Sequence, residues 1–317
     1  MPKPKNEQAS LLFQTSRNGA RLISVLIAVY STSVHAATKT DPIHVVSAQE
    51  INLYLEKFTI IDARESGFRD GHPAGAQAMD WKDWTLEKPN FLHWLIGHPE
   101  NWGKVPLPNE TLRDRLRALG LSEKAPILVV GSPRGWGEEG RIAWNLLYWG
   151  AQDVSLLDGG YPAWVAAKLP IEKGLARPPQ KIGTFTLHLD SDRIAKLNDV
   201  KNNLTTRDRP LLDARSPEEF LGKRMEAQKR GGHLPGAKLI SVSELYQPNG
   251  YYVNAAKLSA LYGARASKSA ITYCVGGVRS ALLALLIEAR LGIKVANYDA
   301  SIWEWSNETN LPLISGQ

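Results

Sequence analysis

The chain has 317 residues, of which 43% are hydrophobic, and it carries a formal net charge of +6. This length is enough for about two domains, and the composition is that of an ordinary globular protein. The charged residues are scattered with mixed sign. This argues against nucleic acid as a partner, because such binding needs basic residues gathered on one face. The single cysteine excludes any disulfide within the chain.

The N-terminal segment has the pattern of a secretory signal peptide. Two arginines precede a short apolar run at residues 22–30, and Val34 and Ala36 fit the small or apolar positions before a cleavage site. We expect residues 1–36 to be removed and the mature protein to be periplasmic and free of the membrane. Its net charge would be +3, because the leader holds four basic residues and one acidic residue. The alternative is an uncleaved anchor, although the run is shorter than the roughly 20 apolar residues that span a bilayer.

The rest of the chain contains one sequence unit twice. Four matched segments occur in the same order in both copies, which chance does not explain: 59–64 with 210–215, 71–76 with 232–237, 157–164 with 298–305, and the Leu-Pro pairs 169–170 with 311–312. A glycine and two prolines interrupt the periodic patterns between the copies. We therefore expect an N-terminal domain at residues 37–177, a linker at 178–184 and a C-terminal domain at 185–317.

Short apolar runs alternate with helical patterns in both copies. The expected strands are 58–61, 127–130, 154–157, 211–212, 271–273 and 295–298, and the expected helices are 140–149 and 279–291, each with one apolar face and a glycine at its end. This alternation indicates an α/β fold in which helices cover both faces of a parallel sheet. Ligands of such sheets bind beyond the carboxyl ends of the strands.

The only cysteine, Cys274, follows one of these strands, and Arg279 opens the next helix. Free N–H groups at the start of a helix and the helix dipole both favour negative charge. A thiol held there should have a lowered pKa, and the arginine adds a positive charge with a planar fork for an oxyanion. The pattern predicts a thiolate nucleophile in an anion-binding loop formed by Val275, Gly276, Gly277, Val278 and Ser280. The competing interpretation is a cysteine that only packs a strand end.

These motifs resemble those of tandem-domain rhodaneses of the exported bacterial type, a family of thiosulfate and 3-mercaptopyruvate sulfurtransferases. The matching pieces are residues 213–220, 232–237, 274–280 and 298–299 with Trp305 in the second copy, and 62–64, 71–72 and 158–164 in the first. The resemblance spans nearly all of residues 42–317. It implies two rhodanese-like domains in tandem, each a parallel sheet with helices on both faces.

The resemblance also implies a two-step reaction. The Cys274 thiolate takes the outer sulfur of a small anionic donor and becomes a persulfide, and a thiol, cyanide or a protein then accepts that sulfur. No metal or organic cofactor is required. The matching region of the first copy, residues 129–141, has no cysteine, as in relatives whose N-terminal domain only supports the other. Asp213 and Arg215 either brace the cysteine loop or form a plain ion pair, and we interpret His72 and His233 as structural.

The loop sequence favours thiosulfate as the donor. Cys274, Gly277, Arg279 and Ser280 form the pattern C-x-x-G-x-R-S of bacterial thiosulfate sulfurtransferases. Relatives that use 3-mercaptopyruvate carry an arginine where this chain has Glu219, and a carboxylate there would repel that substrate. The alternatives are a 3-mercaptopyruvate sulfurtransferase, a non-enzymatic sulfur carrier, and a cysteine phosphatase. Cysteine phosphatases use C-x5-R, whereas four residues separate the cysteine from the arginine here.

Overall fold

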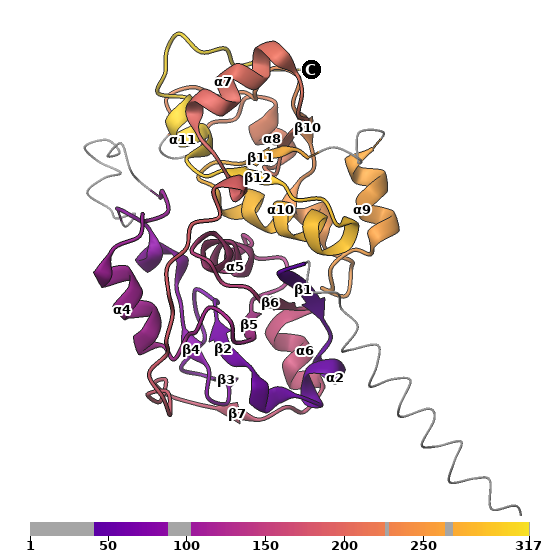
Figure 1. Ribbon diagram of the computed structural model, residues 1–317. Coiled ribbons are helices and arrows are strands. Elements are labelled where there is room, and N and C mark those ends of the chain that lie inside the picture. Colours follow the sequence, from indigo (N-terminus) through magenta and orange to yellow (C-terminus); the bar gives the residue numbers. More distant parts are fainter. Residues whose placement is uncertain (1–40, 88–102, 226–227, 264–268, 317) are drawn as a thin grey trace, which may run out of the picture. The chain divides into compact units, whose positions relative to one another are not determined.

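A computed structural model of the protein describes residues 41–87, 103–225, 228–263 and 269–316 (Figure 1). The expected signal peptide lies outside the described residues. No helix within these ranges combines the length and the apolar character that crossing a membrane requires.

The N-terminal domain alternates strands and helices along the chain. Its strands are β1 (Ile43–Val46), β2 (Thr59–Asp62), β3 (His72–Pro73), β4 (Gln77–Ala78), β5 (Ile127–Val130), β6 (Val154–Leu157) and β7 (Ile171–Glu172). Its helices are α2 (Ala48–Asn52), α4 (Glu110–Ala118), α5 (Glu138–Tyr148) and α6 (Gly160–Ala166), with 3-10 helices at Leu55–Lys57 and Trp81–Trp84.

The C-terminal domain repeats this alternation. Its strands are β8 (Ile194–Ala195), β9 (Leu211–Asp213), β10 (Lys238–Leu239), β11 (Ile271–Tyr273) and β12 (Ala296–Tyr298). Its helices are α7 (Leu197–Thr206), α8 (Pro217–Phe220), α9 (Ala255–Tyr262), α10 (Val278–Leu291) and α11 (Ser301–Trp305), with 3-10 helices at Ser191–Arg193 and Val242–Leu245.

Each domain has a five-stranded parallel sheet, and both sheets have the same strand order. The order is β1-β6-β5-β2-β4 in the N-terminal domain and β8-β12-β11-β9-β10 in the C-terminal domain. Strand β5 therefore corresponds to β11, and helix α5 to α10. The α/β fold and the internal repeat expected from the sequence are confirmed.

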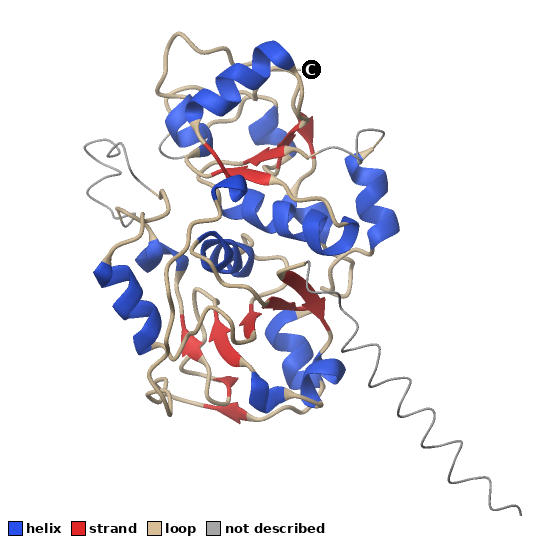
Figure 2. Ribbon diagram, viewed as in Figure 1, coloured by secondary structure: helices blue, strands red, loops and turns tan. Residues whose placement is uncertain are grey.

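Helices cover both faces of each sheet (Figure 2). Along β5, Ile127 and Val129 enter a core that the two domains share, whereas Leu128 and Val130 face an outer core that includes Trp164 of α6. The C-terminal sheet is covered in the same way, by α10 within the shared core and by α7 and α11 on its outer face. Strands buried on both faces consist of unbroken apolar residues, which is why the sequence revealed them.

The domains pack against each other through helices α5 and α10. Gly140 of α5 lies so close to Leu282 of α10 that a Cβ atom at residue 140 would be 2.5 Å from the Leu282 Cα. The prediction of a single apolar face is wrong for α5, because all of its residues are buried, including two glutamates and an arginine. One side faces its own sheet and the other faces the C-terminal domain.

The predicted strand bounds are accurate at the sheet centres. Strands β5, β6 and β11 have the predicted bounds, and β2, β9 and β12 differ by one residue at one or both ends. The edge strands β1 and β8 and the short strands β4 and β10 were not predicted, because they carry fewer buried side chains. Gly150 and Gly292, expected at the ends of α5 and α10, have φ angles of 113° and 66°.

The predicted linker runs along the N-terminal domain. The Gly183 N–H donates to the Arg117 carbonyl at 2.8 Å, and the His188 N–H donates to the Trp149 carbonyl at 2.8 Å. The Phe185 side chain is fully buried in the shared core. The first residues assigned to the C-terminal domain by sequence are thus held by contacts with the N-terminal domain.

The repeated histidines make the same contacts in the two domains. His72 stacks on Phe68 with ring centroids 3.8 Å apart, and His233 stacks on Phe220 at 3.6 Å. In each pair the histidine Nδ1 hydrogen-bonds the carbonyl of the same phenylalanine at 2.8 Å. These contacts hold both histidines in place within their domains, which agrees with the structural interpretation.

Candidate active site

Cys274 directly follows β11, a central strand of the C-terminal sheet, and its loop ends at α10. The residue is only 1% exposed. Its N–H donates to the Ser301 Oγ at 3.0 Å, and its carbonyl accepts the Ile302 N–H at 3.3 Å. The Val275 carbonyl accepts the Trp303 N–H at 2.9 Å. The start of α11 therefore fixes the backbone on which the thiol is carried.

The pKa of the Cys274 thiol lies below its ordinary value. Burial alone would raise this pKa, but the positive charge of Arg279, hydrogen bonds from the Ser280 side chain and N–H, and the Gly276 N–H together outweigh that effect. The Ser280 hydroxyl also donates to the Asn297 Oδ1 at 2.6 Å, so its one proton serves either that oxygen or the thiolate. The lowered pKa that the sequence predicted follows from these contacts.

The loop closes tightly because residues 276 and 277 have no side chains. A Cβ atom on Gly276 would lie 2.0 Å from the ring of Trp303. Gly277 has a φ angle of 77°, and a Cβ atom on it would lie 2.3 Å from the Asp299 carbonyl oxygen. This backbone needs glycine for both its conformation and its space. The indole of Trp303 thus lies against the cysteine loop at Gly276, a contact that sequence reasoning missed.

Arg279 forms a buried, two-pronged ion pair with Glu219 of α8. Its Nη1 and Nη2 donate to the two carboxylate oxygens at 2.6 Å and 2.8 Å. Burial would raise the pKa of Glu219, but its hydrogen bonds and ion pair with Arg279 outweigh this and lower it. Glu219 is therefore ionised, and the positive charge of Arg279 balances its negative charge. This pairing weakens the argument that Glu219 repels a carboxylate substrate. Both charged residues are visible in the sequence, but their contact could not be predicted from it.

Trp136 of the N-terminal domain lies beside this ion pair. The Arg279 guanidinium carbon is 4.8 Å from the centroid of the Trp136 ring, which is 52% exposed. Among the tryptophans of the first half, Trp84 is buried in the shared core, while Trp94 and Trp102 lie outside the described residues. The N-terminal domain therefore contributes an aromatic wall next to the arginine of the cysteine loop.

Asp213 and Arg215 form a fully buried pair at the end of β9. The Arg215 Nη2 donates to Asp213 Oδ2 at 2.6 Å and to the Gly232 carbonyl at 2.8 Å. Arg64 makes the same contacts with Asp62 and Gly71 in the N-terminal domain, which has no cysteine. Since the pair occurs in both copies, we interpret it as part of the fold that holds the strand end.

The corresponding loop of the N-terminal domain leads to two buried carboxyl groups, those of Glu138 and Glu139. The Glu139 Oε1 accepts hydrogen bonds from the hydroxyls of Tyr246 and Tyr252 of the other domain, at 2.8 Å and 2.9 Å. Burial, with the negative charge of Glu138, raises the pKa of Glu139 to about 7. Where the C-terminal domain holds a thiol, this copy holds a carboxyl group that links the two domains.

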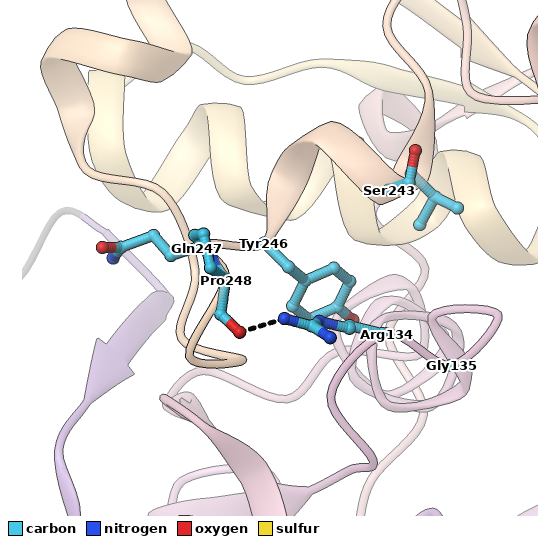
Figure 3. A pocket seen from close by; sticks show the side chains of 7 residues that line it. Arg134, Gly135, Ser243, Tyr246, Gln247 and Pro248 are labelled. Atoms are coloured by element: carbon cyan, nitrogen blue, oxygen red, sulfur yellow. Dashed lines mark hydrogen bonds between the residues drawn. The ribbon is translucent and has the colours of Figure 1, made fainter.

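A pocket of about 430 Å³ opens between the domains beside this loop (Figure 3). Its residues are Arg134 and Gly135 from the N-terminal domain and Val242, Ser243, Tyr246, Gln247 and Pro248 from the C-terminal domain. The guanidinium of Arg134 donates to the carbonyl of Pro248 across the pocket.

The C-terminal wall of the pocket belongs to the sheet edge that carries the cysteine. The Val242 N–H donates to the Ala214 carbonyl at 3.1 Å, and the Ala214 N–H donates to the Tyr273 carbonyl at 2.9 Å. The wall is thus two strands away from Cys274, or roughly 10 Å at the usual spacing of strands.

Comparison with known proteins agrees with this geometry. The sequence matches the family described as Rhodanese-like domain twice, over residues 47–167 and 196–308. A thiosulfate sulfurtransferase of Azotobacter vinelandii is 31% identical over 250 residues, which cover 78% of this chain and 86% of the relative. A sulfur carrier protein, TtuD of Thermus thermophilus, is 28% identical over 269 residues, which cover 78% and 86%.

A solved structure has the same fold. SseA of Escherichia coli, described among 3-mercaptopyruvate sulfotransferases, aligns with a TM-score of 0.68 at 24% identity. The alignment covers 81% of this chain and 98% of that protein. At 24% identity this similarity establishes the fold and does not indicate the substrate.

We predict that Glu139 makes stability depend on pH. Its pKa is about 7 in the fold against an ordinary 4.5, so its contribution is complete below about pH 4.5 and is lost as the pH rises through about 7. The loss is on the order of 3 kcal/mol. Glu139→Gln keeps an acceptor for both tyrosines but does not titrate. The melting temperature of the wild type should therefore fall relative to this variant between about pH 5 and pH 8.

The control is Glu110→Gln, which changes a carboxyl group whose side chain is 87% exposed. It should follow the wild-type pH dependence. Parallel curves for the wild type and Glu139→Gln would contradict the assignment of the proton to Glu139.

Proposed function

Because this chain belongs to the rhodanese family, with two rhodanese-like domains in tandem, we propose that it transfers sulfane sulfur from thiosulfate through a persulfide on Cys274. The observation that carries the proposal is a single thiol whose pKa is lowered, in a loop that favours negative charge. The relatives named thiosulfate sulfurtransferase support this reaction.

In the first step the Cys274 thiolate attacks the outer sulfur of thiosulfate. A sulfur–sulfur bond forms to the cysteine, the bond to the sulfonate sulfur breaks, and its electron pair leaves with sulfite. The protein then carries a persulfide anion. In the second step cyanide or a thiolate attacks the terminal sulfur, which leaves as thiocyanate or as a new persulfide, and the thiolate returns.

The residues of the loop have separate roles in this cycle. The charge of Arg279, the hydroxyl and N–H of Ser280 and the N–H of Gly276 lower the pKa of the thiol, and the same groups would stabilise the persulfide anion. Val275, Gly277 and Val278 complete the loop around that charge. Asp213 and Arg215 support it indirectly, since they hold the adjacent strand end.

The loop pattern favours thiosulfate over 3-mercaptopyruvate as the donor. Cys274, Gly277, Arg279 and Ser280 form the pattern C-x-x-G-x-R-S, and relatives from Corynebacterium glutamicum and Azotobacter vinelandii are named thiosulfate sulfurtransferase. 3-Mercaptopyruvate is the alternative donor. A carrier role, in which the acceptor is another protein, is a second candidate because the Thermus thermophilus relative is named a sulfur carrier protein.

We also propose that residues 1–36 direct export to the periplasm. The support is the basic segment, the apolar run and the residues before Ala36. Expression of the full chain in a bacterium should give a periplasmic protein whose intact mass is that of residues 37–317. A membrane-bound product of full mass would indicate the anchor instead.

The persulfide cycle predicts a defined change in mass. Residues 37–317 incubated with thiosulfate should gain one sulfur atom, and cyanide should remove it. Cys274→Ser should gain nothing, because the chain has no other cysteine. Incubation with 3-mercaptopyruvate ranks the two donors, and no gain with either one would refute the proposed function.

The ion pair between Arg279 and Glu219 should limit the affinity for thiosulfate. Glu219→Gln keeps the cap of α8 but removes a negative charge beside the arginine, so KM for thiosulfate should fall roughly fivefold. Glu218→Gln in the same helix is the control, because its side chain is exposed. Equal KM values for the two variants would mean that the charge of Arg279 does not act on the donor.

A further inference from the structure

Helix α5, in the domain without a cysteine, contains a fully buried arginine, Arg141. Its Nη2 donates to the Gly103 carbonyl at 2.8 Å, and its Nη1 donates to the carboxylate of Asp299 and to the Gly277 carbonyl, the latter at 3.3 Å. A guanidinium removed from water is tolerated only when it is paired and hydrogen-bonded. Two of these three acceptors belong to the C-terminal domain, and one lies in the cysteine loop.

The contact with Gly277 fixes the orientation of a loop peptide. Its carbonyl oxygen also accepts a hydrogen bond from the Asn297 Nδ2 at 3.0 Å. In a planar trans peptide the C=O and N–H bonds point in opposite directions. The two donors therefore turn the N–H of Val278 to the other side of the peptide. Val278 is the first residue of α10, so its N–H has no acceptor within the helix and remains available to the loop.

The contact with Asp299 balances a charge near the thiol. Asp299 is 4% exposed, and its second oxygen accepts the Val105 N–H at 2.7 Å. Its backbone carbonyl lies against Gly277, so the carboxylate is close to the loop. Without the positive charge of Arg141, this buried carboxylate would oppose a thiolate or a persulfide.

We propose that Arg141 is a positioning residue for the cysteine loop, through which the N-terminal domain keeps Cys274 in its ionised form. The thiolate itself is a property of the loop, and only the effect on sulfur transfer rests on the proposed function. The inference gives the domain without a cysteine a defined part in the chemistry. It acts through Arg141 on the orientation of a peptide and on the local charge.

The test compares Arg141→Leu and Arg141→Lys with Arg193→Leu. Arg193 is a matched control, because it is 1% exposed and pairs with Glu288 of α10 through bonds of 2.6 Å and 2.8 Å. Glu288 is nine residues beyond Arg279, or about 14 Å along the helix. Both leucine variants therefore remove a buried ion pair between an arginine and an acid, but only Arg141→Leu removes one beside the cysteine loop.

The first readout is the rate at which iodoacetamide alkylates the single cysteine as a function of pH. Arg141→Leu should raise the pKa of the thiol by about one unit, and Arg193→Leu should leave it unchanged. Arg141→Lys should restore the thiol pKa. A second change, Asp299→Asn, should return the pKa of Arg141→Leu toward the wild-type value.

The second readout is thiosulfate turnover. Arg141→Leu should lower kcat/KM by roughly tenfold to a hundredfold, because small displacements of reacting groups have effects of this size. Arg141→Lys should recover only part of kcat, since an ammonium supplies the charge without the planar fork. Arg193→Leu should lower the melting temperature, because it leaves Glu288 buried and unpaired, but should keep the turnover of the folded fraction.

A shared loss of stability in both leucine variants, with no change in the thiol pKa, would overturn the proposal. If Arg141→Leu does not fold, the Arg141→Lys variant provides the test. A wild-type kcat in Arg141→Lys would rule out a positioning role for the planar guanidinium of Arg141. If the wild type transfers no sulfur, the proposed function fails, while the alkylation curves still test the effect of Arg141 on the thiol.

Discussion

The close approach of helices α5 and α10 is the constraint on which the rest of the structure depends. It requires Gly140, because a side chain there would overlap the backbone of Leu282. The two helices follow corresponding central strands, so their contact brings the first turn of one beside the first turn of the other. This places Trp136 and Arg141 of one domain next to Arg279 and Gly277 of the other.

Buried charges around the cysteine loop occur in pairs. Arg279 is matched by Glu219 and Arg141 by Asp299. Each arginine supplies a positive potential to the loop, and each acid limits how far that potential extends. The thiol is the additional negative group in this arrangement, so its ionisation adds to a set of charges that is otherwise balanced.

The sequence predicted those parts of the fold that are determined locally. Strands β5, β6 and β11 could be located because each is a run of apolar residues buried on both faces. The cysteine loop could be located because its glycines and the start of α10 are adjacent in the chain. The repeat of Asp62-Ala63-Arg64 at residues 213–215 indicates the internal symmetry from the sequence alone.

Contacts between distant residues could not be predicted in the same way. Arg141 and Asp299 are 158 residues apart, and Glu219 pairs with a residue 60 positions away. Each of these charged side chains looks solvent-exposed when only its neighbours in the chain are considered. Their burial depends on how two complete domains meet, and neither hydrophobic periodicity nor local motifs contain that information.

The contact of Glu139 with Tyr246 and Tyr252 has a consequence for the history of such duplicated chains. The carboxyl group of Glu139 fills the space beside Gly131, so that a Cβ atom at residue 131 would lie 2.5 Å from it. A thiol restored to this loop would meet an acid instead of an arginine, and the acid is held by two tyrosines of the other copy. A single substitution to cysteine therefore cannot give the first copy the thiol environment of the second copy, because the packing of Glu139 against the other domain prevents it.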